Sequence, residues 1–492
     1  MNLNELTIQD AHKKLQNKEI SSFELVQACI KRTEDTDDKI KAFLAKDYDN
    51  ALDQAKQVDV KIKKGKKLKP LEGIPCGIKD IILTKGIITT ASSNMLRNYK
   101  PLFDATVIER LKNDGAIILG KHNCDAWGHG SSTENSDYGP SHNPWDLTRV
   151  PGGSCGGSAA SISADQVLFA LGGDTGGSIR QPSAFCGCIG LKPTYGRVSR
   201  YGGIAMASSL DTIGPITKNV GDAAIVMNTI AGQDIKDSTT PPNNVPDYTK
   251  VLNKDIKNLK IAVPKQAFGE GLDKNVGQMI KQAINDLEKQ GAKAVEVDLQ
   301  TLDFGLACYY IIQPSEVSSN LGRYDGIRYG HQSKEAKDLM DIYMKSRAEG
   351  FGSEAKRRIM IGTYTLSAGY YDAYYKKAMQ VRTLIKQEFD NIFNDFDVMV
   401  MPASPTTAFK LGEKTDDPLA MYLADIYTVP VSLAGVPAMS VPCGFAENLP
   451  VGMQIIAKQF NEEKIFKLHL LMKKLMVGIK SNLNYKLIIN KY

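Results

Sequence analysis

Two serines in this sequence lie in glycine-rich turns that suit nucleophilic catalysis. Ser154 falls within residues 152–158, which read Gly-Gly-Ser-Cys-Gly-Gly-Ser, and Ser178 ends the run Gly-Gly-Asp-Thr-Gly-Gly-Ser. Free N–H groups in such a turn form a concavity that binds anions. A serine at its end can attack a carbonyl whose developing oxyanion those groups stabilise. One such turn is usually only a tight turn, but two of them flanking one short strand favour catalysis.

A serine nucleophile needs a base, and the histidines do not supply one. None of the six, at positions 12, 122, 129, 142, 331 and 469, has an obvious triad partner. A lysine serves if burial keeps it neutral, because desolvation lowers its pKa below the reference value of about 10.4. A short apolar strand interrupted by Gly and Pro is expected before Lys79. Lys79 is therefore the candidate base, and the Ser154 hydroxyl is available to relay the proton.

Two competing motifs are rejected. Residues 115–121 read Gly-x4-Gly-Lys, but His122 replaces the Ser or Thr that a phosphate-binding loop requires, and the interior reads as a strand. The pattern Gly-x-Ser-x-Gly around Ser154 fits the nucleophile elbow of α/β-hydrolases, which needs a strand directly before the serine. The residues before Ser154 read instead as a loop. The sequence therefore predicts neither a nucleotide-binding loop nor that elbow.

Composition limits the class of protein. The chain has 492 residues, 42% apolar and 24% charged, which is typical of a globular protein with a large core. Its net charge of +6 is too small to indicate nucleic-acid binding by itself. The eight cysteines include no Cys-x-x-Cys pair, so reduced thiols and no metal site are expected. The N-terminus lacks signal-peptide features, and the longest uncharged stretch, 426–446, contains three prolines. We expect a cytoplasmic chain that does not contact membrane.

Strands are expected to alternate with helices along most of the chain. A capping box, Ser21 to Glu24, introduces one of the helices. The alternation predicts an α/β fold with a large mixed, mostly parallel sheet covered by helices on both faces. Expected helices cover 5–18, 22–35, 47–63, 104–113, 159–166, 275–290 and most of 304–390; expected strands cover 116–119, 167–171, 261–264, 294–297, 398–401, 438–441 and 450–457.

Domain organisation is expected to be simple. The sequence shows no internal repeat, low-complexity segment or Pro/Ser-rich linker. We therefore expect one domain over residues 1–492. Within it, 1–65 would form an N-terminal helical segment, 71–476 the catalytic core and 477–492 a peripheral tail.

The same motifs resemble the amidase signature family. The resemblance includes Gly-Ile-Lys-Asp ending at Asp80, both serine turns, and Gly-Leu-Lys-Pro-Thr at 190–194, and it extends to about residue 476. It implies the amidase signature fold and a Ser-cisSer-Lys triad. Carried over by motif, Ser178 is the nucleophile, Ser154 in a cis peptide is the relay and Lys79 is the base. The oxyanion hole would comprise the N–H groups of Thr175, Gly176, Gly177 and Ser178.

Within that family, the sequence is most similar to the A subunits of the Asp/Glu-tRNA amidotransferases. The similarity lies in residues 130–135, 309–326, 356–360 and 421–427. It implies a glutaminase that supplies ammonia to a partner, which amidates Glu-tRNA(Gln), Asp-tRNA(Asn) or both. By the same resemblance, Arg358 and Asp425 hold the glutamine α-carboxylate and α-amino group, and Tyr309 lines a side pocket. A planar guanidinium and a carboxylate are what a zwitterion requires.

The resemblance also implies a heterotrimer with B and C subunits. The B subunit would bind most of the misacylated tRNA, ATP and Mg would act at that partner, and this chain would need no cofactor. Two rivals stay open: a free-standing amidase acting on other amides, and a catalytically silent scaffold. The sequence departs from the usual family pattern at Cys155, Gly173 and Gly128, which stand where Ser, Ser and a small Ser or Ala are expected.

Overall fold

The computed structural model describes residues 2–252 and 256–468, which build one eleven-stranded sheet. The strand order is β1-β3-β2-β4-β6-β5-β10-β11-β9-β7-β8. The strands are β1 Phe43–Lys46, β2 Pro75–Lys79, β3 Ile117–His122, β4 Phe169–Asp174, β5 Ile189–Lys192, β6 Thr212–Thr217, β7 Lys260–Pro264, β8 Lys293–Val297, β9 Val398–Pro402, β10 Ala438–Ala446 and β11 Leu449–Ile456.

The α/β class and the mixed sheet are confirmed, but the expected excess of parallel strands is wrong. Of the ten strand pairings in the described chain, four are parallel and six are antiparallel. Local chain reversals explain the difference. β10 and β11 form a hairpin whose two turn residues, Glu447 and Asn448, have φ of 51° and 66°. Two left-handed residues match the twist of antiparallel strands.

Helices cover both faces of the sheet, as expected. Side chains alternate between faces along a strand, and on β9 Val398 and Val400 join one buried cluster while Met399 and Met401 join another. The first cluster includes residues of α2, α5, α7 and α8, and the second includes residues of α9, α12 and α14. The helices of this paragraph are α2 Ser22–Ile40, α5 Gly156–Ser163, α7 Val220–Ile230, α8 Lys274–Lys289, α9 Leu302–Asn320, α12 Lys377–Asp395 and α14 Val429–Ala434.

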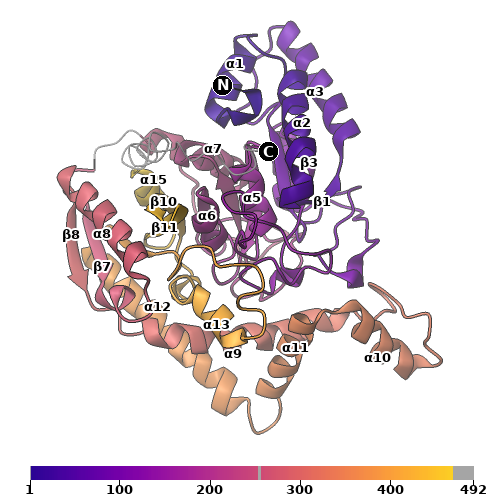
Figure 1. Cartoon of the computed structure of the whole chain (residues 1–492), viewed down its shortest axis with the longest axis vertical. Helices are drawn as coiled ribbons and strands as arrows, with labels where there is room; N and C mark the ends of the chain where they lie inside the picture. Colours follow the sequence, from indigo (N-terminus) through magenta and orange to yellow (C-terminus); the bar gives the residue numbers. More distant parts are fainter. Residues whose placement is uncertain (1, 253–255, 469–492) are drawn as a thin grey trace.

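The N-terminal segment is less purely helical than expected. α1 (Ile8–Gln16), α2 and α3 (Tyr48–Lys63) stand together at one end of the molecule in Figure 1. The capping box is confirmed, because Ser21 and Glu24 bond reciprocally. Between α2 and α3, however, β1 pairs antiparallel with β3 and ties the segment to the sheet.

Helices also dominate residues 302–395, as expected. α9, α11 (Ser353–Thr365) and α12 run across the end of the molecule opposite α1–α3, with α10 (Leu339–Gly350) projecting beyond them (Figure 1). No helix in the described ranges is long and apolar enough to cross a membrane. The predicted peripheral tail, 477–492, lies outside the described residues. The remaining helices are α4 Thr106–Asn113, α6 Arg180–Cys186, α13 Pro418–Tyr422 and α15 Glu462–Phe466.

Candidate active site

Two parallel neighbouring strands bring the candidate base and the second serine turn together. Ile78 of β2 pairs with Leu171 of β4. Because the strands are parallel, their carboxyl ends meet at the same edge of the sheet. Lys79 ends β2, and the turn carrying Ser178 follows β4 directly. The order and register of these two strands therefore place a lysine beside a glycine-rich turn.

Lys79 and Ser154 are in direct contact. The Nζ of Lys79 donates a hydrogen bond to Ser154 Oγ at 2.6 Å and a longer one to the Gly173 carbonyl at 3.3 Å. Each side chain is 1% exposed. The peptide bond between Gly153 and Ser154 is cis. The structure thus brings the predicted base and relay within proton-transfer distance in a water-poor environment.

Burial lowers the pKa of Lys79, because the interior disfavours the ammonium form. Thiolate charge on Cys155 and Cys124 would act the other way and lift that pKa above its ordinary value. Burial, however, raises the pKa of both thiols, that of Cys124 to about 12. Both are therefore uncharged at neutral pH. With both thiols uncharged, burial is the largest influence on Lys79 and favours its neutral form, and the attraction of Asp125 opposes it.

Ser178 lies at the end of a turn that is anchored from both sides. Its carbonyl accepts the Cys155 N–H at 3.1 Å, which fastens the turn to the chain beside the relay. Within the described chain, the N–H groups of Gly176, Gly177 and Ser178 donate to no other group. They remain available for an oxyanion. The hydroxyls of Ser154 and Ser178 form no hydrogen bond with each other in the described structure; catalytic contacts of this kind often close only around substrate.

A buried ion pair fixes the shape of the turn. Arg180 donates to both oxygens of Asp174 at 3.0 Å, and Asp174 also accepts the Ile179 N–H at 3.1 Å. Burial alone would raise the pKa of Asp174, but the Arg180 guanidinium holds it below its ordinary value. This pair was not predicted from the sequence, because a glycine-rich turn separates the two residues and neither the helical nor the strand period applies across it.

Tyr309 stands directly over the oxyanion turn. A Cβ placed on Gly176 would meet Tyr309 Cζ at 2.7 Å, so glycine is needed for the ring to come this close. Gly177 has φ of 153° and faces Thr428. Thr175, which precedes Gly176, donates through its hydroxyl to Asp211 at 2.7 Å. Tyr309, which the resemblance places in a side pocket, therefore packs directly against the turn of the predicted oxyanion hole.

Arg358 and Asp425 lie in one buried polar group. Arg358 donates through Nε to Glu354 at 2.7 Å. Burial alone would lower the pKa of Arg358, but its neighbours, Tyr310 and Glu354 foremost, raise it, so the guanidinium stays charged. Asp425 accepts from Ser131 at 2.5 Å. Burial raises the pKa of Asp425 to about 7, although the Arg358 charge pulls it down. Glu354 and Ser131 were not predicted from the sequence; the i,i+4 spacing of Glu354 and Arg358 was the available signal.

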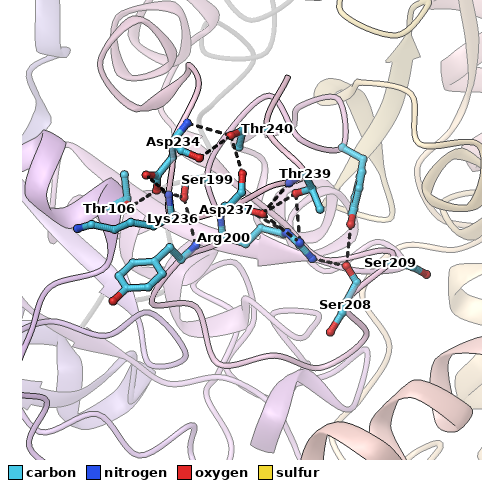
Figure 2. Close-up of polar contacts among 12 residues, drawn as sticks. Thr106, Ser199, Arg200, Ser208, Ser209, Asp234, Lys236, Asp237, Thr239 and Thr240 are labelled. Atoms are coloured by element: carbon cyan, nitrogen blue, oxygen red, sulfur yellow. Dashed lines mark hydrogen bonds and ion pairs between the residues drawn. The ribbon is translucent and has the colours of Figure 1, made fainter. Parts of the chain in front are cut away.

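A cavity of about 280 Å³ opens beside Lys79 and Ser154. Its lining includes Arg200, Lys236 and Asp237, and Figure 2 shows the polar contacts around these residues. Arg200 bonds to Asp237 and to Thr239, the latter at 3.1 Å. Lys236 pairs with Glu109 at 3.2 Å. A second, smaller hollow of about 60 Å³ is lined by Arg358, Ser131 and Glu354 among others. The candidate base thus borders the first space and Arg358 the second, while Asp425 bonds to Ser131 in the wall of the second.

Comparison with known proteins decides the family. The family model described as Amidase matches residues 24–466. The chain is 55% identical over 467 residues to the A subunit of a glutamyl-tRNA(Gln) amidotransferase of Geobacillus thermodenitrificans, covering 95% of this chain and 96% of that protein. This chain belongs to the amidase signature family.

Solved amidase-family structures share the fold. The crystal structure of the A subunit of a glutamyl-tRNA(Gln) amidotransferase from Thermotoga maritima is 42% identical, with a TM-score of 0.80, and the match covers 96% of this chain and 95% of that one. A peptide amidase of Stenotrophomonas maltophilia is 28% identical with a TM-score of 0.80, covering 95% and 96%. The same architecture therefore serves chains with different activities, and side chains at the site must decide between them.

The three departures from the usual amidase-family pattern gather around the base. Cys155 donates through Sγ to the Gly173 carbonyl at 3.2 Å, the same oxygen that Lys79 contacts. A Cβ on Gly173 would meet Ile81 at 2.8 Å, so glycine and that isoleucine fit each other. A Cβ on Gly128 would come within 3.6 Å of Ser154 Oγ. None of the three breaks the contact between Lys79 and Ser154.

Proposed function

We propose that this chain is the glutaminase component of a tRNA-dependent amidotransferase. The observation that carries the proposal is the combination of a buried Lys79–Ser154 contact with a buried cation and carboxylate, Arg358 and Asp425. The Lys79–Ser154 contact provides the base and relay that a serine nucleophile needs to cleave an amide. The buried cation and carboxylate are complementary to the two charged ends of glutamine. The names of the two amidotransferase A subunits described above agree with this reading.

In the proposed reaction, neutral Lys79 takes the hydroxyl proton of Ser154, which takes that of Ser178. Ser178 Oγ attacks the γ-carboxamide carbon, and the N–H groups of the 175–178 turn stabilise the oxyanion. Collapse of this intermediate returns a proton through Ser154 to the leaving nitrogen, which departs as ammonia. Water then attacks the γ-glutamyl ester by the same relay, giving glutamate and free Ser178. Each proton removed is returned, so the site ends as it began.

The free-standing amidase is the rival within the family. An amidase that accepts neutral amides needs no clamp for a zwitterion. Placing a cation and a carboxylate in a dry site is costly unless a ligand or partner compensates them. Arg358 is 3% and Asp425 8% exposed; Glu354 pairs with Arg358, but among the described residues the Asp425 carboxylate accepts only from the neutral Ser131 hydroxyl, so a substrate that brings an ammonium group is favoured. A catalytically silent scaffold, the other rival, would not need a buried contact between Lys79 and Ser154.

The proposal assigns the second half-reaction to partners. Activating a carboxylate requires ATP, and the sequence has no phosphate-binding loop. We assign ATP, Mg and most tRNA contacts to the B subunit, with the C subunit completing a heterotrimer. The direct test of the glutaminase role is ammonia release from glutamine by the purified chain, alone and with candidate B and C subunits. No release under either condition would refute the proposal.

Arg358→Ala should lose selectivity for glutamine. Removing the cation leaves the α-carboxylate of the substrate unpaired, at a cost of roughly 2–5 kcal/mol in a dry site. The kcat/KM for glutamine should fall accordingly, and the variant should barely distinguish glutamine from its α-amide. Lys356→Ala, which removes the neighbouring exposed cation, is the control and should keep the preference. A wild-type preference in Arg358→Ala would place the clamp elsewhere.

Glutamine use should weaken as pH falls through the pKa of Asp425. Because burial raises that pKa to about 7, the carboxylate is charged above neutrality and becomes neutral below it. A protonated Asp425 cannot pair with the α-ammonium group. The kcat/KM for glutamine should therefore decline by up to about tenfold per pH unit below that pKa. Asp425→Asn should have lower activity throughout but lack this limb; an unchanged acid limb in that variant would exclude Asp425 as its source.

A further inference from the structure

Gln313 lies on the face of α9 that borders the site. It follows Tyr309 by four residues, and residues at this spacing share one face of a helix. Tyr309 contacts the oxyanion turn at Gly176, and Gln313 bonds to Arg358. The α9 face therefore spans the interval between the oxyanion turn and the guanidinium of the clamp.

The contact with Arg358 fixes the orientation of the Gln313 amide. Arg358 Nη1 donates to Gln313 Oε1 at 2.7 Å. A guanidinium only donates, so the amide must present its oxygen to it. The amide nitrogen, Nε2, is therefore a donor in a known position. It is buried and has no partner in the described residues.

A second unpartnered group lies near the same guanidinium. His129 is fully buried, and neither ring nitrogen has a partner within the described chain. Burial, with help from the Arg358 charge, lowers the pKa of His129, so the ring is neutral. Buried donors and acceptors are normally satisfied. Gln313 and His129 are therefore two unsatisfied side chains near one buried cation, Arg358. The Nη2 of Arg358 also donates no hydrogen bond to the described residues. Together these groups indicate that a polar ligand binds there.

We propose that Gln313 is a substrate-binding residue whose Nε2 donates a hydrogen bond to the α-carboxylate of bound glutamine while its Oε1 holds Arg358. This inference rests on the proposed glutaminase function. The carboxylate would accept from the cation and from a neutral amide, two donors whose relative position is set by their own hydrogen bond. Gln313 would thereby add both affinity and selectivity for a negatively charged substrate end.

Gln313→Glu tests the donor specifically. Glutamate keeps an oxygen for Arg358 but replaces the N–H donor with an oxygen that repels the substrate carboxylate. Hydrogen bonds to charged groups are strong enough that KM for glutamine should rise about ten- to hundredfold. Glutamine α-amide can donate to the new carboxylate, so its kcat/KM should be unchanged or higher. The ratio of the two substrates is a readout that general damage to the fold would not reverse.

Two further variants keep the test decisive. Gln313→Met removes donor and acceptor without adding charge; it should raise KM for glutamine and leave the α-amide little affected, and it decides the matter if Gln313→Glu does not fold. Gln166→Met removes another fully buried glutamine, which bonds to Thr36 of α2, and should leave KM unchanged. Wild-type KM and selectivity in either Gln313 variant would overturn the inference. Failure of the wild-type chain to hydrolyse glutamine would instead overturn the proposed function.

Discussion

Ser178→Ala should form no covalent adduct with glutamine and should lose glutaminase activity by at least about three orders of magnitude, as expected when a nucleophile is removed. The reason is chemical: alanine has no group to attack the γ-carboxamide. Ser178 ends a turn in which the Gly176, Gly177 and Ser178 N–H groups donate to no described residue and whose shape is fixed by Asp174 and Arg180. The scaffold of the turn does not depend on the Ser178 hydroxyl, so the variant should fold normally.

Intact-mass measurement after rapid quench checks this expectation. Wild-type protein should carry a γ-glutamyl ester, and Ser178→Ala should not. Ser183→Ala is the matched control: this serine lies one turn later, bonds to the Ile179 carbonyl at 2.7 Å, and should retain both adduct and turnover. An adduct that survives in Ser178→Ala would assign the nucleophile to another residue.

Lys79→Arg should reduce turnover by at least about two orders of magnitude, the usual scale for loss of a general base. Arginine retains the positive charge but stays protonated, so it cannot accept the proton that Ser154 relays. The expectation depends on Lys79 being neutral in its buried position, 2.6 Å from Ser154.

Comparison with Lys79→Met separates the base from a purely electrostatic role. If Lys79 acts as a base, both variants should lose activity to a similar degree, because neither can take a proton. If its charge alone mattered, arginine would rescue what methionine loses. Single-turnover acylation and thermal unfolding, measured on both variants, distinguish a chemical defect from loss of fold. Near-normal acylation in Lys79→Arg would contradict the lysine-base mechanism.

The sequence predicted those parts of the site that depend on local structure. Lys79 ends one apolar strand and the Ser178 turn follows another. A strand that leads into a glycine-rich turn is visible in one short segment of sequence. Their proximity follows from the parallel pairing of β2 and β4. The contact between Lys79 and Ser154 joins residues 75 positions apart. The residue types alone indicate a lysine base with a serine relay, although their contact depends on the tertiary fold.

The clamp could not be derived in the same way. Arg358 lies on α11 and Asp425 follows α13, and no local pattern relates them. They were assigned from family resemblance, and only the tertiary fold buries them together. Three strands were missed for physical reasons. β1 and β5 have only four residues each, and β6 contains Gly214 and Pro215, which are normally read as turn residues.

Ammonia made by this chain should be consumed by a partner, and transfer of labelled nitrogen tests this most directly. The measurement is a reconstitution with ATP, Glu-tRNA(Gln), candidate B and C subunits, and glutamine labelled with ¹⁵N in its amide. We predict that ¹⁵N appears in Gln-tRNA(Gln) when this chain is present with its partners, and that replacing it with Ser178→Ala stops the transfer while added ammonium salt restores product. Formation of labelled Gln-tRNA(Gln) by this chain alone, or by the partners with glutamine in its absence, would contradict the proposed division of labour.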